Sequence, residues 1–271
     1  MPKIDFGPVG AVVSPANDGF VETAAQLEQL GFSTIWLTGG PMAALSQIAD
    51  VVRATKAVKV ASAIIAVDRF PATDVAALYG ELESAAPGRF IVGLGGAHGA
   101  DPLVTRNAYL DQLDAVPSTA RVMAALGPKM LDLARDRSSG AFPVLVTSEY
   151  VARAREALGP ATTLAVEQLV VLEPDPSRAR SIARGPLSFL GTVPAYQSSF
   201  RRMGFSADDV SQLSDHLLDS LIVWGGIGAV VERVKTLQDA GADHVALSIV
   251  SASPAPSLDE WRELARAVVP K

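Results

Sequence analysis

The feature that most constrains the fold of this chain is a repeated alternation of short apolar segments with segments of helical spacing. Eight apolar runs, rich in β-branched residues and bounded by glycine or proline, are predicted to be strands. Runs without polar alternation are typical of parallel strands that helices cover on both sides. The predicted strands are residues 9–13, 34–37, 58–67, 90–94, 121–126, 142–146, 162–172 and 243–250.

Helical spacing of apolar residues follows most of these strands. Residues 176–222 read as several helices without a strand, which predicts a helical insertion between strands 7 and 8. Eight strand–helix units in 271 residues predict an α/β fold, a (β/α)8 TIM barrel formed as a single domain over residues 1–271. A doubly wound sheet is the alternative, but it usually has a glycine fingerprint after its first strand, and Val13-Ser14-Pro15 lacks one. The predicted helices are residues 19–30, 42–55, 71–84, 107–116, 129–137, 148–158, 227–240 and 258–269.

Composition excludes several classes of function. The chain has no cysteine, so disulfides, thiolate metal sites and cysteine nucleophiles are ruled out. The three histidines lack metal-ligand spacing, so we expect no metal site. A net charge of −6 with scattered basic residues argues against nucleic-acid binding. No basic segment leads into an apolar run at the N-terminus, and no long uncharged apolar stretch is present, so we expect a cytoplasmic protein without a membrane partner.

The most distinctive stretch runs from Pro87 to Gly99. Residues 90–92 form a short apolar run, and glycines begin at Gly93, where the strand should end. Glycine lets bare backbone approach whatever lies there, although a tight turn after a core strand explains the same pattern. Sites in barrels lie at the carboxyl ends of the strands. That rule selects Ser14 and Thr38 as well as Gly93 and Gly95.

Four segments resemble the luciferase-like monooxygenase and F420-dependent oxidoreductase superfamily. Residues 87–95, Pro-Gly-Arg-Phe-Ile-Val-Gly-Leu-Gly, resemble the strand-4 signature of that family, and residues 30–37 are similar to its second strand. Residues 126–134, Leu-Gly-Pro-Lys-Met-Leu-Asp-Leu-Ala, resemble its phosphate-binding segment. Residues 225–234 and 240–245 resemble its last helix and strand. Within the family the chain looks most like a short subgroup of F420-dependent oxidoreductases.

The resemblance implies a luciferase-like barrel that binds a deazaflavin, coenzyme F420, or alternatively FMN. Its third strand carries a bulge against the flat ring, often with a non-proline cis peptide, which points here to Ala63 and Ile64. The alternative for these two residues is plain core strand. The phosphate segment implies cofactor binding by Leu126, Gly127, Pro128, Lys129 and Met130.

The phosphate segment also has a physical rationale. Pro128 suits the first position of a helix, and we expect the backbone N–H groups of Lys129, Met130 and Leu131 to point out of the helix N-terminus, where the dipole favours an anion. An ordinary strand-to-helix turn is the alternative.

His98 follows strand 4 and is the candidate catalytic acid or base, because histidine titrates in the useful range. A loop histidine that bonds the backbone is the alternative. His244 begins strand 8, at the wrong end for catalysis, and is interpreted as structural, whereas His216 is expected at a surface or in helix packing. Relatives carry a histidine or acid after strand 2 where this chain has Thr38-Gly39-Gly40. Asp68 and Arg69 either contact the cofactor or form a helix-entry ion pair.

The resemblance therefore implies an oxidoreductase that transfers a hydride between coenzyme F420 and an unidentified small organic substrate. An FMN-dependent luciferase-like monooxygenase is one alternative, and a cofactor-binding protein with a degenerate site is another. Residues 42–55 and 71–84 are rich in alanine and leucine with few charges, so we expect a homodimer that packs these helices together.

Overall fold

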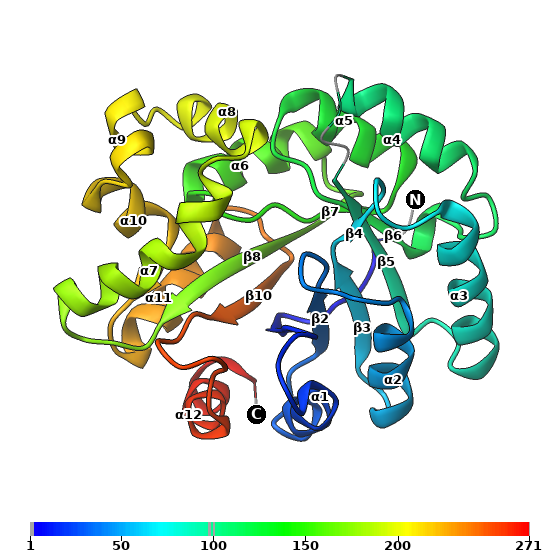
Figure 1. The fold of residues 1–271 in the computed structure, drawn as a ribbon, viewed down its shortest axis with the longest axis horizontal. Coiled ribbons are helices and arrows are strands. Elements are labelled where there is room, and N and C mark those ends of the chain that lie inside the picture. Colours follow the sequence, from blue (N-terminus) through cyan, green and yellow to red (C-terminus); the bar gives the residue numbers. More distant parts are fainter. Residues whose placement is uncertain (1–2, 97–98, 100, 271) are drawn as a thin grey trace.

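The strands close into a parallel barrel with helices around it (Figure 1). The computed structural model describes residues 3–96, 99 and 101–270. Pairing of β10 with β8 over six residue pairs closes the sheet, which confirms the (β/α)8 prediction. The barrel strands are β1 Val9–Val13, β2 Thr34–Thr38, β3 Lys59–Ala63, β5 Phe90–Gly95, β6 Arg121–Met123, β7 Gly140–Ala141, β8 Thr163–Val171 and β10 His244–Ile249.

Two short strands extend the sheet at the carboxyl ends of the barrel strands. Strand β4, Ile65–Ala66, continues the path of β3 and pairs with β5. Strand β9, Val223–Trp224, pairs with the end of β8 and was not predicted from the sequence.

Helices cover the outside of the barrel, and a further group of helices lies together beside β8 (Figure 1). This second group, α7–α10, is the predicted insertion, and it packs its own hydrophobic cluster, which includes Phe200 and Leu217, against Leu169 and Val171 of β8. The outer helices are α1 Phe20–Gln29, α2 Ser46–Ala54, α3 Ala72–Ala85, α4 Pro102–Asp111, α5 Pro128–Arg137, α6 Ser148–Leu158, α11 Ile227–Asp239 and α12 Leu258–Val268, and those of the insertion are α7 Pro176–Leu190, α8 Pro194–Arg202, α9 Ala207–Gln212 and α10 Asp215–Leu221. None of the described helices has the length and apolar character needed to cross a membrane.

Several predicted elements differ from the structure, three of them markedly. The sixth strand is β7, Gly140–Ala141, and not residues 142–146, because Pro143 has no N–H for the ladder and Leu145 adopts a φ of 56°. The fourth helix starts at Pro102 and not at residue 107, because the Asp101 carboxylate accepts from the Val104 N–H and caps it. The third strand is not continuous but breaks between Ala63 and Ile65.

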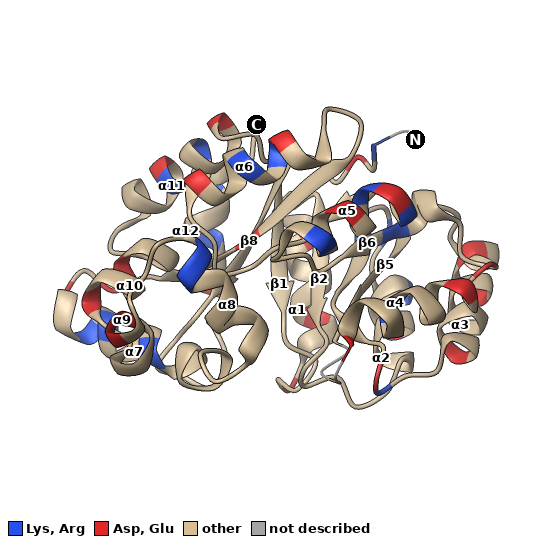
Figure 2. Ribbon diagram, turned by 90° about the horizontal axis from the view of Figure 1, so that it is seen from above, with Lys and Arg blue, Asp and Glu red and all other residues tan. Residues whose placement is uncertain are grey.

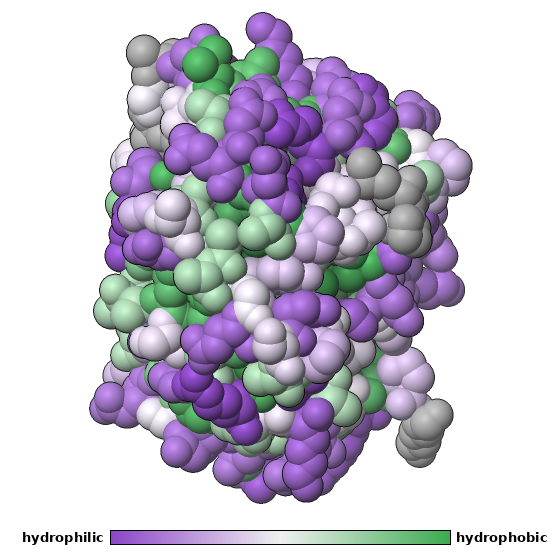
Figure 3. All heavy atoms as spheres, turned by 90° about the vertical axis from the view of Figure 1, so that its right-hand side faces the viewer, coloured by the Kyte–Doolittle hydropathy of each residue, from purple (hydrophilic) through white to green (hydrophobic). Residues whose placement is uncertain are grey.

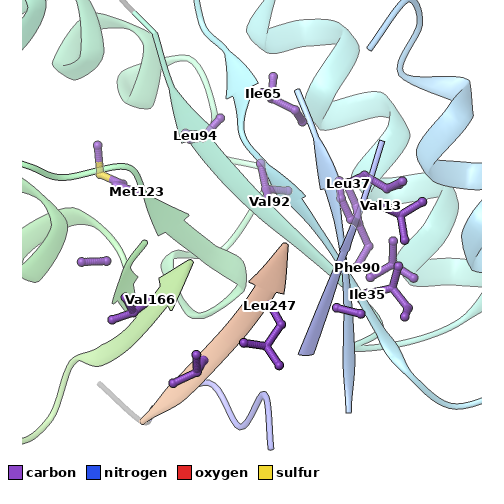
Figure 4. Packing of buried hydrophobic residues seen from close by; sticks show 14 of the residues in the cluster. Val13, Ile35, Leu37, Ile65, Phe90, Val92, Leu94, Met123, Val166 and Leu247 are labelled. Atoms are coloured by element: carbon purple, nitrogen blue, oxygen red, sulfur yellow. The ribbon is translucent and has the colours of Figure 1, made fainter. Parts of the chain in front are cut away.

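Alternate residues of each strand face two different cores. One face packs against the helices, where Val13, Leu37 and Val166 belong to a large apolar cluster (Figure 4). The other face fills the barrel. Trp36 and Phe142 stack inside it with ring centroids 4.0 Å apart, so the middle of the barrel is closed by side chains and a ligand can enter only from its ends.

His244 lies inside the barrel at the N-terminal end of β10, as expected for a structural residue. Its Nδ1 is 2.7 Å from the Gly7 carbonyl oxygen, and its Nε2 accepts from the Trp36 indole N–H at 3.0 Å. Because one ring nitrogen must donate and the other must accept, these contacts require the neutral imidazole. Burial lowers the His244 pKa to about 4.

Candidate active site

A bulge interrupts the third barrel strand at its carboxyl end. The Ala63–Ile64 peptide is cis, at the position where the resemblance implied such a bond. Both residues are only half-buried, and both pack on the cluster that fills the barrel. The backbone here therefore turns toward the open end of the barrel with two small or aliphatic side chains beside it.

Glycines on both neighbouring strands make room for this bulge. A Cβ at Gly39, just after β2, would lie 1.6 Å from the Ile64 carbonyl oxygen, and one at Gly93 would lie 1.9 Å from the Ser62 carbonyl oxygen. Such distances are impossible, so any other residue at Gly39 or Gly93 displaces the bulge. The Gly39 N–H also donates to the Ala63 carbonyl. The requirement for glycine at this position explains why no catalytic side chain follows the second strand directly.

The glycines of β5 leave room for the chain's own groups. The space that a Cβ would fill at Gly95 holds the Ile64 side chain, whose Cδ1 lies 2.3 Å from that position. Gly93 and Gly95 thus support the bulge in this structure, and contact of either with a cofactor remains a prediction.

The start of α5 offers fewer free donors than the sequence suggested. The N–H groups of Met130 and Leu131 both lie 3.0 Å from the Gly127 carbonyl oxygen, as in an ordinary first helical turn, so the expectation that they are free is wrong. Among the described residues, the backbone N–H groups of Gly127 and Lys129 have no acceptor. Gly127 has an extended backbone, with φ −109°, that any residue could adopt.

A cation from the helical insertion lies over this helix start. Arg202, the last residue of α8, donates to the Leu126 carbonyl at 3.3 Å, and its Nη2 is 3.5 Å from where a Gly127 Cβ would be. Arg201 and Arg202 form the basic end of α8, which lies beside the barrel in Figure 2. Sequence analysis missed Arg202, because 76 residues separate it from Leu126 and only the fold of the insertion joins them.

A cavity of about 100 Å³ opens between the carboxyl ends of β1, β2 and β10. Ser14, Thr38 and Ser248 are among the residues that line it. The Thr38 hydroxyl is buried and has no partner among the described residues. A polar cavity with an unused hydroxyl can accept a small polar group. The cavity thus brings together two of the predicted site residues, Ser14 and Thr38.

A carboxyl group that sequence analysis missed lies inside this end of the barrel. Glu167 follows Ala165 by two residues on β8, so its side chain shares the inward face of the strand. Its backbone N–H donates to the Pro143 carbonyl at 3.0 Å, and its carboxylate accepts a hydrogen bond from the Ser248 side chain. Burial raises the Glu167 pKa to about 7. A lone glutamate in an apolar strand was the available signal.

The remaining polar candidates have other surroundings. His98, the predicted catalytic residue, lies outside the described residues. Arg69 donates to the carbonyls of Gly39, Gly40 and Met42, so it ties together the loops after two strands. His216 is exposed beside the Phe205 ring. Within residues 3–96, 99 and 101–270, no group of three acidic or histidine side chains could hold a metal ion.

The helices on which the dimer prediction rests turn their large apolar side chains inward. Ile48, Val52, Val75 and Leu82 are buried in the chain itself. The large apolar residues that are exposed, within the described part of the chain, are Val104, Phe189 and Val231, none of them on α2 or α3. Figure 3, the side that lies to the right in Figure 1, shows hydrophobic residues scattered among hydrophilic ones. The dimer therefore stays a prediction, without the apolar surface that motivated it.

Comparison with known proteins confirms the resemblance over the first part of the chain. Residues 7–108 match the model of the luciferase-like monooxygenase family. The sequence matches none of the curated proteins with which it was compared.

Solved structures with the same fold include enzymes of two cofactor types. An F420-dependent secondary alcohol dehydrogenase in complex with an F420-acetone adduct is 14% identical, with a TM-score of 0.76 over 99% of this chain and 98% of that one. A coenzyme F420-dependent tetrahydromethanopterin reductase from Methanopyrus kandleri is 13% identical, with a TM-score of 0.71 over 97% and 98%. The oxygenating constituent of 3,6-diketocamphane monooxygenase from Pseudomonas putida, in complex with FMN, is also 13% identical, with a TM-score of 0.71 over 97% and 98%. Identities this low establish the fold alone.

Proposed function

We propose that this chain is an oxidoreductase that uses coenzyme F420 to transfer a hydride to or from a small organic substrate. The observation that carries the proposal is the bulge at Ala63–Ile64, which occupies the position implied by the resemblance and is half-exposed at the carboxyl end of a luciferase-like barrel. A flat ring system suits such a surface, because Ala63 permits close approach and Ile64 supports the ring from one side.

The phosphate of the cofactor fits the start of α5. The N–H groups of Gly127 and Lys129, which have no acceptor among the described residues, and the guanidinium of Arg202 lie at the same helix start, where the helix dipole favours an anion. Arg202 thus adds to the sequence-predicted set Leu126–Met130.

When bound, the reduced deazaflavin would supply a hydride, that is, one proton with two electrons, and it would not activate oxygen. The residues of the chain then have three tasks. They hold the ring, they hold the phosphate, and they supply or accept the proton that balances the charge that hydride transfer leaves on the substrate. Ser14, Thr38 and Ser248 line the space where a small substrate would lie.

Equilibrium fluorescence titration with F420 and with FMN tests the proposal. We expect tighter binding of F420, weakened by Arg202→Ala. Micromolar FMN binding with no F420 binding would favour the FMN-dependent monooxygenase and refute the proposal. F420 binding without hydride exchange against any of a panel of carbonyls and alcohols would indicate the degenerate-site alternative.

A further inference from the structure

The carboxyl of Glu167 is set apart from the other acidic side chains by its position. It faces the interior of the barrel, above the stacked rings of Trp36 and Phe142 that close the middle. A charged carboxylate in such surroundings is costly unless it is paired, and no described Lys or Arg forms an ion pair with it. Its polar partner is the Ser248 hydroxyl. Because a buried carboxyl costs more free energy than an apolar side chain of similar size, we consider a chemical role for Glu167.

Ser248 connects this carboxyl to the cavity. The residue lies two positions beyond Ala246, the register partner of Glu167, and it lines the cavity with Ser14 and Thr38. A serine hydroxyl can donate one hydrogen bond and accept another at the same time. Ser248 can therefore accept a proton from Glu167 on one side while it donates its own to a group in the cavity on the other.

We infer that Glu167 and Ser248 form a proton relay in which Glu167 stores the proton and the Ser248 hydroxyl delivers it to a substrate oxygen in the cavity. The inference rests on the proposed function and extends it to the source of the proton. In the reduction of a carbonyl, the hydride forms the new C–H bond and the carbonyl π electrons move to oxygen. That oxygen takes the Ser248 hydroxyl proton, Ser248 takes the proton of Glu167, and the Glu167 carboxylate is reprotonated from solvent.

The surroundings of Glu167 allow this role near neutral pH. The neighbouring strand segments bring Val144 and Ala246 beside it, neither of which titrates. From the insertion, Tyr196 on α8 faces it, and burial together with the Glu167 charge raises the pKa of that phenol, so Tyr196 stays neutral. Burial holds the Glu167 pKa at about 7, which leaves a proton available for transfer at neutral pH.

The first arm of the test needs no cofactor. Infrared difference spectroscopy of the whole protein should show a protonated carboxyl that titrates near neutral pH and vanishes in Glu167→Gln. Glu173→Gln, the same change just beyond the end of β8, should retain the signal, because the Glu173 side chain is partly exposed and paired with Arg178. Ser248→Ala should shift the titration to higher pH by removing a hydrogen bond to the carboxylate, and Ser248→Thr should restore it. Absence of the titrating carboxyl, or no shift in Ser248→Ala, overturns the relay.

The second arm measures the pH dependence of carbonyl reduction with reduced F420. The wild-type rate should fall as the pH rises through the Glu167 pKa. Glu167→Gln should lose that dependence together with about 100-fold in kcat/KM at pH below the pKa, a usual contribution for general acid catalysis. Glu173→Gln should behave as wild type. An unchanged pH profile in Glu167→Gln overturns the relay. If no protein, wild type included, turns over with F420, the proposed function fails and the first arm alone decides about the relay.

Discussion

Replacement of Glu167 by glutamine should change how stability depends on pH, before any cofactor is considered. Burial raises the pKa of this carboxyl from 4.5 to about 7 in the folded protein. Between these two pH values the folded chain holds a proton that the unfolded chain has released. The free energy of unfolding contributed by this group is therefore fully present below pH 4.5 and is lost as the pH rises toward 7.

The magnitude follows from the shift. Each unit of pKa difference corresponds to about 1.4 kcal/mol, so a shift of about 2.5 units costs the wild type roughly 3 kcal/mol between pH 4.5 and pH 7. Glutamine cannot titrate. The unfolding free energy of Glu167→Gln, minus that of the wild type, should thus rise by about 3 kcal/mol over this range.

Urea unfolding at a series of pH values between 4 and 8 measures this difference, and subtraction removes the contributions of groups common to both proteins. Glu173→Gln is the control, since its carboxylate, held below its ordinary pKa by the Asp175 N–H and by Arg178, should give no such rise. Parallel stability curves for wild type and Glu167→Gln would mean that the Glu167 carboxyl is solvated and ionised in the folded chain, and the reasoning about its burial would be refuted.

Three further predictions follow from single contacts. Gly39→Ala should destabilise the chain by several kcal/mol, because its Cβ would clash with the Ile64 carbonyl. Gly40→Ala, with nothing within 4 Å of its Cβ, should change the melting temperature little. Equal effects of the two substitutions in thermal melts would show that the Ile64 carbonyl does not constrain Gly39. Arg202→Ala should weaken F420 binding more than Lys129→Ala while melting curves stay unchanged, because Arg202 is the side chain placed against Gly127; the reverse order in fluorescence titration contradicts this placement. The free energy of unfolding should also fall as the pH drops from 6.5 toward 4, because His244 binds a proton in the unfolded chain but stays neutral in the folded one. In urea titrations, His244→Gln should reduce this loss of stability at low pH. An unchanged loss would mean that other groups cause it.

Local chemistry made much of the fold predictable. The segments that form β1, β5 and β8 are buried along nearly their whole length. Their sequences are therefore nearly all apolar, without alternating polar residues, and can be recognised as strands. Ser148–Leu158 was predicted to the residue, since Gly159 beyond its end marks the C-terminus of the helix. The start of α5 was nearly as clear, because proline suits the first turn of a helix, where Pro128 lies.

The sequence by itself determined the barrel and the segment that begins α5, because each depends on the periodicity of nearby residues or on glycine and proline, whereas the position of the bulge was implied by the family resemblance. Only the tertiary structure decided that Gly39 and Gly93 serve the bulge and that Arg202 reaches Gly127. It alone also placed the Glu167 carboxyl against Ser248. These contacts join residues from different strands and from the insertion, and their chemistry depends on burial and distance, which no local pattern encodes.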